Sequence, residues 1–127
     1  MKRILLVPIG ALVLTLAFSV YVSVKTTAET ELLQAQLEAA DAYAVSGEIE
    51  QTTAALLESY DCWNGMQTYL HIVSRHDVID DAEAMYRRAL AFAAAQAMPE
   101  LRAEIADLTD QLRLLVETEQ CSIKNIL

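Results

Sequence analysis

The sequence predicts an all-α protein in which an N-terminal transmembrane helix continues into a three- or four-helix antiparallel bundle. Residues Ile4–Val24 contain no charged side chain. Apolar residues recur at helical steps of three and four through most of the remaining chain. The 127 residues include only three glycines and two prolines, too few for a β-sandwich or a barrel. We therefore divide the chain into a cytoplasmic stub and anchor, residues 1–25, and an extracytoplasmic helical bundle, residues 26–127.

The uncharged run is long enough for one membrane crossing. As a helix it would extend over about 31 Å, the thickness of the hydrocarbon core of a bilayer. Lys2 and Arg3 precede the run and only Lys25 follows closely, so the positive-inside rule predicts a single-pass protein of the cell membrane with a cytoplasmic N-terminus. A cleaved signal peptide remains an alternative, with Ala17–Ser19 as a small-residue cleavage site.

The part of the chain that follows the anchor is strongly acidic. Residues 26–127 hold 6 basic and 18 acidic side chains, a net charge of −12, and the whole chain has a net charge of −9. Nucleic acid is therefore excluded as a partner, because its phosphates need a basic surface. Anionic headgroups also repel such a domain, so we expect the bundle to stand off the membrane rather than lie on it.

Three helical segments are expected before the last one. The first continues from the anchor to Gly47, because glycine readily takes the left-handed conformation that ends a helix. The second begins near Glu48 and is kinked or divided near Gly65. The third has Asp77 as its N-cap and ends near Ala97. The predicted core faces of these segments are Leu33, Leu37, Ala40 and Ala44; Ile49, Thr53, Leu56, Tyr60 and Trp63; and Ile79, Ala82, Met85, Tyr86, Ala89, Leu90 and Ala93.

The fourth segment has the clearest pattern, with Pro99 in its first turn. Its apolar residues keep the alternating four- and three-residue spacing of a packed seam. These seam residues are Leu101, Ile105, Leu108, Leu112 and Leu115. The side chains predicted to face water are Arg102, Glu104, Asp107, Asp110 and Arg113.

No catalytic arrangement is visible in the sequence. It has no glycine-rich phosphate loop, nucleophile elbow or haem-attachment motif, so we expect no enzyme activity and no cofactor. His71 and His76 lie five residues apart and on different faces of a helix, which does not suit a metal pair. His76 is instead expected to order the turn into the third helix, close to Asp80.

Two further features concern cysteines and aromatic residues. Cys62 and Cys121 would both lie outside the cytoplasm, where a disulfide can persist, and the alternative is two free buried thiols. Metal or redox chemistry through these cysteines and the two histidines is a further alternative. Trp63 lies near Tyr60 and Tyr69 in sequence, an aromatic group that suits either core packing or a docking surface.

Several of these residues, taken in order, resemble a bacterial family of unknown function. They are Trp63, the His-x-x-Ile-Asp opening of the third helix at His76 to Asp80, and the ending Ser122–Leu127, which includes Asn125. Members of this family are short, singly anchored helical membrane proteins, mainly of Gram-positive and often spore-forming bacteria, and many end in Ser-Leu-Lys-Asn-Ile-Phe. Leu127 and the two cysteines depart from that pattern.

The resemblance implies an accessory subunit of a multi-pass membrane protein and supplies no catalytic or ligand-binding residues. Together with the residue patterns, it leads us to expect a non-enzymatic protein whose acidic extracytoplasmic bundle binds a membrane-protein partner. The alternative is an extracytoplasmic small-molecule sensor that acts through such a partner. The sequence specifies no oligomeric state.

Overall fold

The computed structural model describes the backbone of residues 2–73 and 76–126, and the side chains of these residues except 68, 71–73 and 119–126. This described part contains four α-helices and no strand. The helices are α1 (Lys2–Val45), α2 (Ile49–Val73), α3 (His76–Ala94) and α4 (Met98–Ile126). The predicted all-α class is therefore confirmed, and the bundle has four helices because the second half of α1 is one of them.

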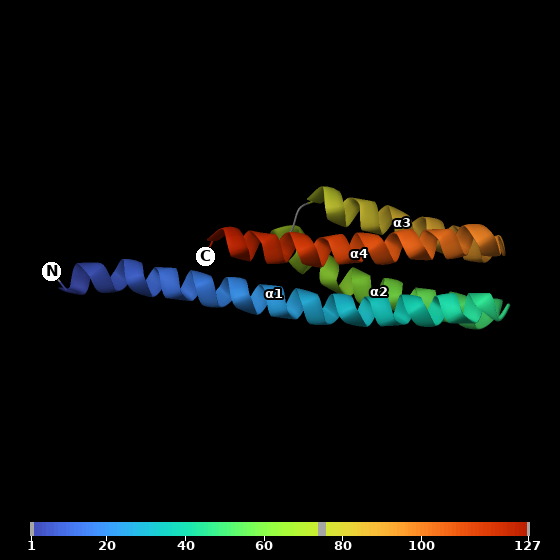
Figure 1. The fold of residues 1–127 in the computed structure, drawn as a ribbon, viewed down its shortest axis with the longest axis horizontal. Helices are drawn as coiled ribbons and strands as arrows, with labels where there is room; N and C mark the ends of the chain where they lie inside the picture. The colour runs from blue at the N-terminus through green and yellow to red at the C-terminus, as the bar shows by residue number, and fades with distance from the viewer. Residues whose placement is uncertain (1, 74–75, 127) are drawn as a thin grey trace.

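The four helices form an antiparallel bundle in which each helix packs against the next in sequence and α4 closes against α1. Figure 1 shows α1 and α3 running in one direction and α2 and α4 in the other. The α1–α2 and α3–α4 turns lie together at the end farthest from the N-terminus (Figure 1). The ends of α2 and α4 and the start of α3 lie at the opposite end, beside the middle of α1.

α1 is one helix with two different surroundings. From Val22 onward one of its faces is buried in the bundle. Before Val22, the described side chains are exposed except for Leu16 and Ser19, which are partly buried. In this first half α1 is long and apolar enough to cross a membrane, a property that a signal sequence near an N-terminus shares. The buried face comprises Val22, Thr26, Thr30, Leu33, Leu37, Ala40 and Ala44.

Gly47 ends α1 as predicted. Its φ angle is 75°, in the left-handed region. The N–H of Gly47 donates to the carbonyl oxygen of Ala44 at 3.1 Å, and the N–H of Glu48 donates to that of Tyr43 at 2.9 Å. This pair of bonds is a Schellman motif, which satisfies carbonyl groups that the end of the helix would leave unpaired.

The same motif ends α3, at a residue that is not glycine. Gln96 has a φ angle of 56°, and its N–H donates to the carbonyl oxygen of Ala93 at 3.1 Å. The N–H of Ala97 donates to that of Phe92 at 2.9 Å. Because Gln96 turns the chain, α3 ends at Ala94, before the predicted boundary. A left-handed conformation costs a residue with a Cβ about 1–2 kcal/mol.

α2 is one helix through Gly65, so the predicted division into two helices is wrong, and the predicted kink stays a prediction. A glycine inside a helix costs only about 1 kcal/mol relative to alanine. Trp63 and Met66, on either side of Gly65, are both buried, and this packing outweighs that cost.

The predicted face of α2 is also rotated from the real one. The buried positions of α2 recur at alternating steps of four and three, and two of them, Thr52 and Ser59, are polar. Within the predicted face, Ile49, Thr53 and Tyr60 are only half-buried. The hydroxyl of Thr52 donates to the carbonyl oxygen of Glu48 at 2.7 Å, which satisfies it within its own helix. The buried core positions are Thr52, Leu56, Ser59, Trp63, Met66 and Leu70.

α3 and α4 follow the predicted patterns with small shifts. α3 begins at His76, so Asp77 lies in the first turn rather than at the N-cap. Within the predicted face of α3, Met85 and Leu90 are only partly buried. Pro99 lies in the first turn of α4, as predicted. All five predicted seam residues of α4 are buried.

Glu104 was predicted to face water, and that prediction is wrong. The residue is 9% exposed, and its carboxylate accepts a hydrogen bond from Nε of Arg88 on α3 at 2.9 Å. α4 packs against both α1 and α3, so its buried stripe is wider than a two-position seam. An acidic side chain at the border of that stripe is therefore enclosed beside a cation.

Candidate functional site

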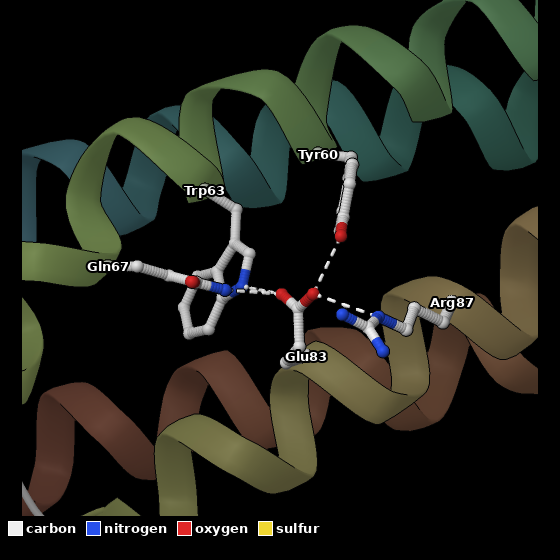
Figure 2. Close-up of polar contacts among 5 residues, drawn as sticks. All are labelled: Tyr60, Trp63, Gln67, Glu83 and Arg87. Atoms are coloured by element: carbon white, nitrogen blue, oxygen red, sulfur yellow. Dashed lines mark hydrogen bonds and ion pairs between the residues drawn. The ribbon is translucent and has the colours of Figure 1, made fainter.

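A cluster of polar side chains lies between α2 and α3 around the carboxylate of Glu83 (Figure 2). Tyr60 donates through its hydroxyl to Oε1 of Glu83 at 2.6 Å, and Trp63 donates through Nε1 to Oε2 at 2.8 Å. Nε2 of Gln67 donates to Oε2, and Nε of Arg87 donates to Oε1 at 3.1 Å. One carboxylate thus accepts hydrogen bonds from side chains of two helices.

Helical geometry places these donors together. Tyr60, Trp63 and Gln67 recur at steps of three and four, so their side chains lie on one face of α2. Figure 2 shows them pointing across the gap toward α3. Arg87 follows Glu83 by four residues and therefore lies one turn further along the same side of α3.

The surroundings of Glu83 keep it ionised. Its side chain is 18% exposed, and Trp63 is fully buried. Burial raises the pKa of Glu83, but the hydrogen bonds from Tyr60 and Trp63 and the charge of Arg87 together lower it more, so the pKa lies below its ordinary value of 4.5. A carboxylate has about four sites for hydrogen-bond donors, and the surrounding donors occupy them. The arrangement ties α2 to α3.

A second tyrosine, Tyr86, packs against the side chains of this cluster. Tyr86 is fully buried, and its hydroxyl shares a hydrogen bond of 2.7 Å with the hydroxyl of Ser59. Its ring lies 5.5 Å from that of Tyr60 and 5.7 Å from that of Trp63, between centroids. Burial raises the pKa of Tyr86, so its hydroxyl stays protonated. These contacts connect the polar cluster to the aromatic part of the core.

The sequence pattern indicates only part of this cluster. Trp63 and Tyr60 belong to it, whereas Tyr69 lies apart and contacts α1. Glu83 was missed, although one signal was present, a carboxylate between the core positions Ala82 and Tyr86. That signal is common on helices that face water.

Tyr69 contacts the part of α1 where the bundle begins. Its hydroxyl donates to the carbonyl oxygen of Val22 at 3.2 Å and lies 3.5 Å from the hydroxyl oxygen of Thr26. The ammonium group of Lys25 lies 4.8 Å from the centroid of the Tyr69 ring, a cation–π contact.

His76 and Asp80 lie in the first two turns of α3, and both are exposed. The role proposed for His76 in ordering the turn before α3 stays a prediction. The side chain of His71 lies outside the described residues. Among the side chains that the structure does describe, no group of three or more His, Cys, Asp and Glu could hold a metal ion.

Cys62 is half-buried, and its sulfur accepts a hydrogen bond from Nε2 of Gln36 at 3.5 Å. The side chains of Cys121 and Asn125 lie outside the described residues, so the disulfide and the role of Asn125 stay predictions.

Two of the surface grooves are further candidate sites. One, of about 430 Å³, lies between α1 and α4 beside the ion pair of Arg102 with Asp41, whose atoms are 3.0 Å apart. The other, of about 280 Å³, lies between α1 and α2, where Leu32, Cys62 and Gly65 line it.

Comparison with known proteins gives one match. The model of a family described as a domain of unknown function (DUF4363) matches residues 20–126. The matched range begins within a few residues of Val22, where α1 enters the bundle. Comparisons with curated proteins and with solved structures found no match.

Proposed function

Because the chain belongs to the DUF4363 family of domains of unknown function, we propose its function from its architecture. It is a single-pass membrane protein with a cytoplasmic N-terminus, and its acidic helical bundle binds a membrane-protein partner outside the cytoplasm without catalysing a reaction.

The observation that carries this proposal is the change in surroundings along α1. Val22 is the first buried residue of the helix, and the described side chains between Lys2 and Tyr21 are exposed except for Leu16 and Ser19, which are partly buried. Exposure of that apolar surface to water is unfavourable, whereas the hydrocarbon core of a bilayer would solvate it. The hydroxyl of Thr15 donates to the carbonyl oxygen of Ala11 at 2.8 Å, so this polar group needs no water.

The proposed binding role is supported by the bundle surface and by the Glu83 cluster. The polar side chains of that cluster are occupied in joining α2 to α3, which suits a rigid binding module. Several large apolar side chains stay exposed on the bundle and could anchor a partner. They are Leu32, Tyr43, Val45, Leu57 and Leu114.

Membrane insertion is tested by floating the full-length chain with phospholipid vesicles at high salt and high pH. We expect the chain to float, and to lose residues 26–127 to protease added outside intact cells. Recovery of the chain in the soluble fraction, or protection of those residues in intact cells, would refute the topology. Release of a chain without its first two dozen residues would support the signal-peptide alternative.

The partner is tested by placing a photo-crosslinking amino acid at Leu32, which is 53% exposed beside the α1–α2 groove. Glu58, exposed on α2, is the control position. We expect a crosslink to one multi-pass membrane protein from position 32 and not from position 58. Equal crosslinking at the two positions would count against a specific surface.

The groove between α1 and α4 favours a second candidate, a sensor of small molecules. Its charged lining includes Glu38, Asp41 and Arg102. A ligand that raises the melting temperature of the wild type, and not that of a variant in which the exposed groove residue Ala106 is replaced by tryptophan (Ala106→Trp), would support this function. A shift that is equal in the two proteins would refute binding in the groove.

A further inference from the structure

We propose that the membrane-facing end of the bundle is a second lipid contact, in which residues 121–126 of α4 enter the outer edge of the hydrocarbon core beside α1, and Tyr69 and Lys25 lie next to them in the headgroup layer. This inference rests on the proposed insertion of α1 and adds a partner surface to it.

The register between α1 and α4 places residues 121–126. Nε2 of Gln34 donates to the carbonyl oxygen of Thr109 at 3.5 Å, and Nε of Arg102 bonds Oδ1 of Asp41 at 3.0 Å. These two pairs lie seven residues apart along both helices, so each residue forward along α1 corresponds to one residue backward along α4. The backbone of α4 continues as helix to Ile126.

Extending this register gives the level of the α4 end against α1. Twelve residues beyond the Gln34–Thr109 pair, Val22 is level with Cys121. Five residues further, Ala17 is level with Ile126, within about one helical turn. Figure 1 shows the same arrangement, with the end of α4 beside α1 short of its N-terminus.

The burial of α1 agrees with this placement. Leu16 and Ser19 are partly buried, while the other described residues from position 2 to position 21 are exposed. They precede the buried Val22 by six and three residues, so all three lie on one side of the helix. That side is the one that faces the bundle.

The membrane span and the bundle therefore overlap along the chain. The uncharged run extends from Ile4 to Val24, but the bundle already reaches down to the level of Ala17. A hydrocarbon core of about 30 Å needs about 20 helical residues. If Ile4 marks its inner edge, the outer edge falls near Val24. Residues 121–126, which are level with Val22 to Ala17, then lie about 3–10 Å inside that edge and not in bulk water.

The side chains of Tyr69 and Lys25 suit the headgroup layer. Tyr69 and Lys25 are in contact there, and tyrosine and lysine are both favoured where apolar and polar surroundings meet. Residues 121–126 read Cys-Ser-Ile-Lys-Asn-Ile, with a single cation and no acidic group. The net negative charge of the bundle keeps its sides away from anionic lipid, whereas residues 121–126 themselves carry no acidic group.

The test measures depth in the full-length chain, reconstituted in vesicles of phosphatidylcholine with some phosphatidylglycerol. In a background of Cys62→Ala and Cys121→Ser, single cysteines at positions 121–126 carry a nitroxide. Collisions with oxygen and with a water-soluble nickel chelate report the depth of each label. Phe18→Cys is the control within the span, and Ser46→Cys, in the far turn, is the control in water.

We expect collisions with nickel to fall several-fold from Ser46→Cys to positions 121–126, and oxygen collisions to rise toward position 126. Collisions at all of 121–126 equal to those at Ser46→Cys would overturn the inference while leaving the insertion of α1 intact. Strong nickel collisions at Phe18→Cys would instead overturn the insertion itself. Fluorescence of the buried Trp63 shows which labelled variants are folded. Where a variant is not folded, the depth is taken from the labels at neighbouring positions.

Discussion

Replacing Glu83 by alanine removes the shared acceptor of the cluster between α2 and α3. Nε1 of Trp63 is then left without an acceptor inside the core, because Trp63 is fully buried, and this costs about 1–3 kcal/mol. Tyr60 is half-buried and can turn its hydroxyl toward water, so it adds about 0.5–1 kcal/mol. Arg87 is exposed and contributes little.

Alanine has a higher helix propensity than glutamate, and this offsets less than about 0.7 kcal/mol of the lost stability. We therefore expect Glu83→Ala to lower the free energy of unfolding by about 2 kcal/mol. In a bundle of about 100 residues that corresponds to a melting temperature lower by about 8–16 °C.

The assay follows Trp63 fluorescence during heating of the full-length chain in a mild detergent. Trp63 is the one tryptophan of the sequence, and it lies in the bundle core, so its emission reports unfolding of the bundle. Glu58→Ala is the matched control, since Glu58 is exposed on α2 and the chemical change is the same. We expect the control to change stability by less than about 0.5 kcal/mol. Equal melting temperatures for the two variants would refute the reasoning.

Three further predictions concern single positions. The folded-state pKa of Glu83 is lowered, so the wild type should be more stable than Glu83→Gln above pH 4.5. This difference in the free energy of unfolding should be lost as the pH falls through the folded-state pKa, and a difference that grows in acid would contradict the prediction. Gln96→Gly should raise the free energy of unfolding by about 1 kcal/mol in urea titrations, because φ is 56° there, and a loss of stability would show that the side chain matters more. Gly65→Ala should also stabilise the bundle, by up to about 1 kcal/mol, since an added Cβ meets no atom within 4 Å; a destabilised variant would indicate crowding between α1 and α2.

The elements predicted correctly from the sequence depend on local physics. The seam from Leu101 to Leu115 is apolar at every step, and Gly47 is the residue type that a Schellman motif favours, so neither needs knowledge of a partner helix. The apolar run from Ile4 is helical and long enough to cross a membrane, whereas the membrane span itself stays a prediction. The predicted roles of Cys121 and Asn125 depend on side chains outside the described residues and stay predictions.

The elements that were predicted wrongly depend on neighbours distant in sequence. Thr52 and Ser59 occupy core positions because their hydroxyls find acceptors or partners, and a pattern of apolar residues cannot register that. Glu104 is enclosed because Arg88 of another helix lies beside it. Gly65 stays helical because the residues on either side are packed.

By itself, the sequence determined that the chain is helical, where α1 ends, which face of α4 is buried and where an apolar run could enter a membrane, because each of these depends on residues within a few turns of one another. Only the tertiary structure decided that Glu83 joins α2 to α3 and that α4 reaches back along α1 to the level of Ala17. The physical reason is that a buried polar group is stable only beside its partner, and that register between helices is set by packing across the bundle.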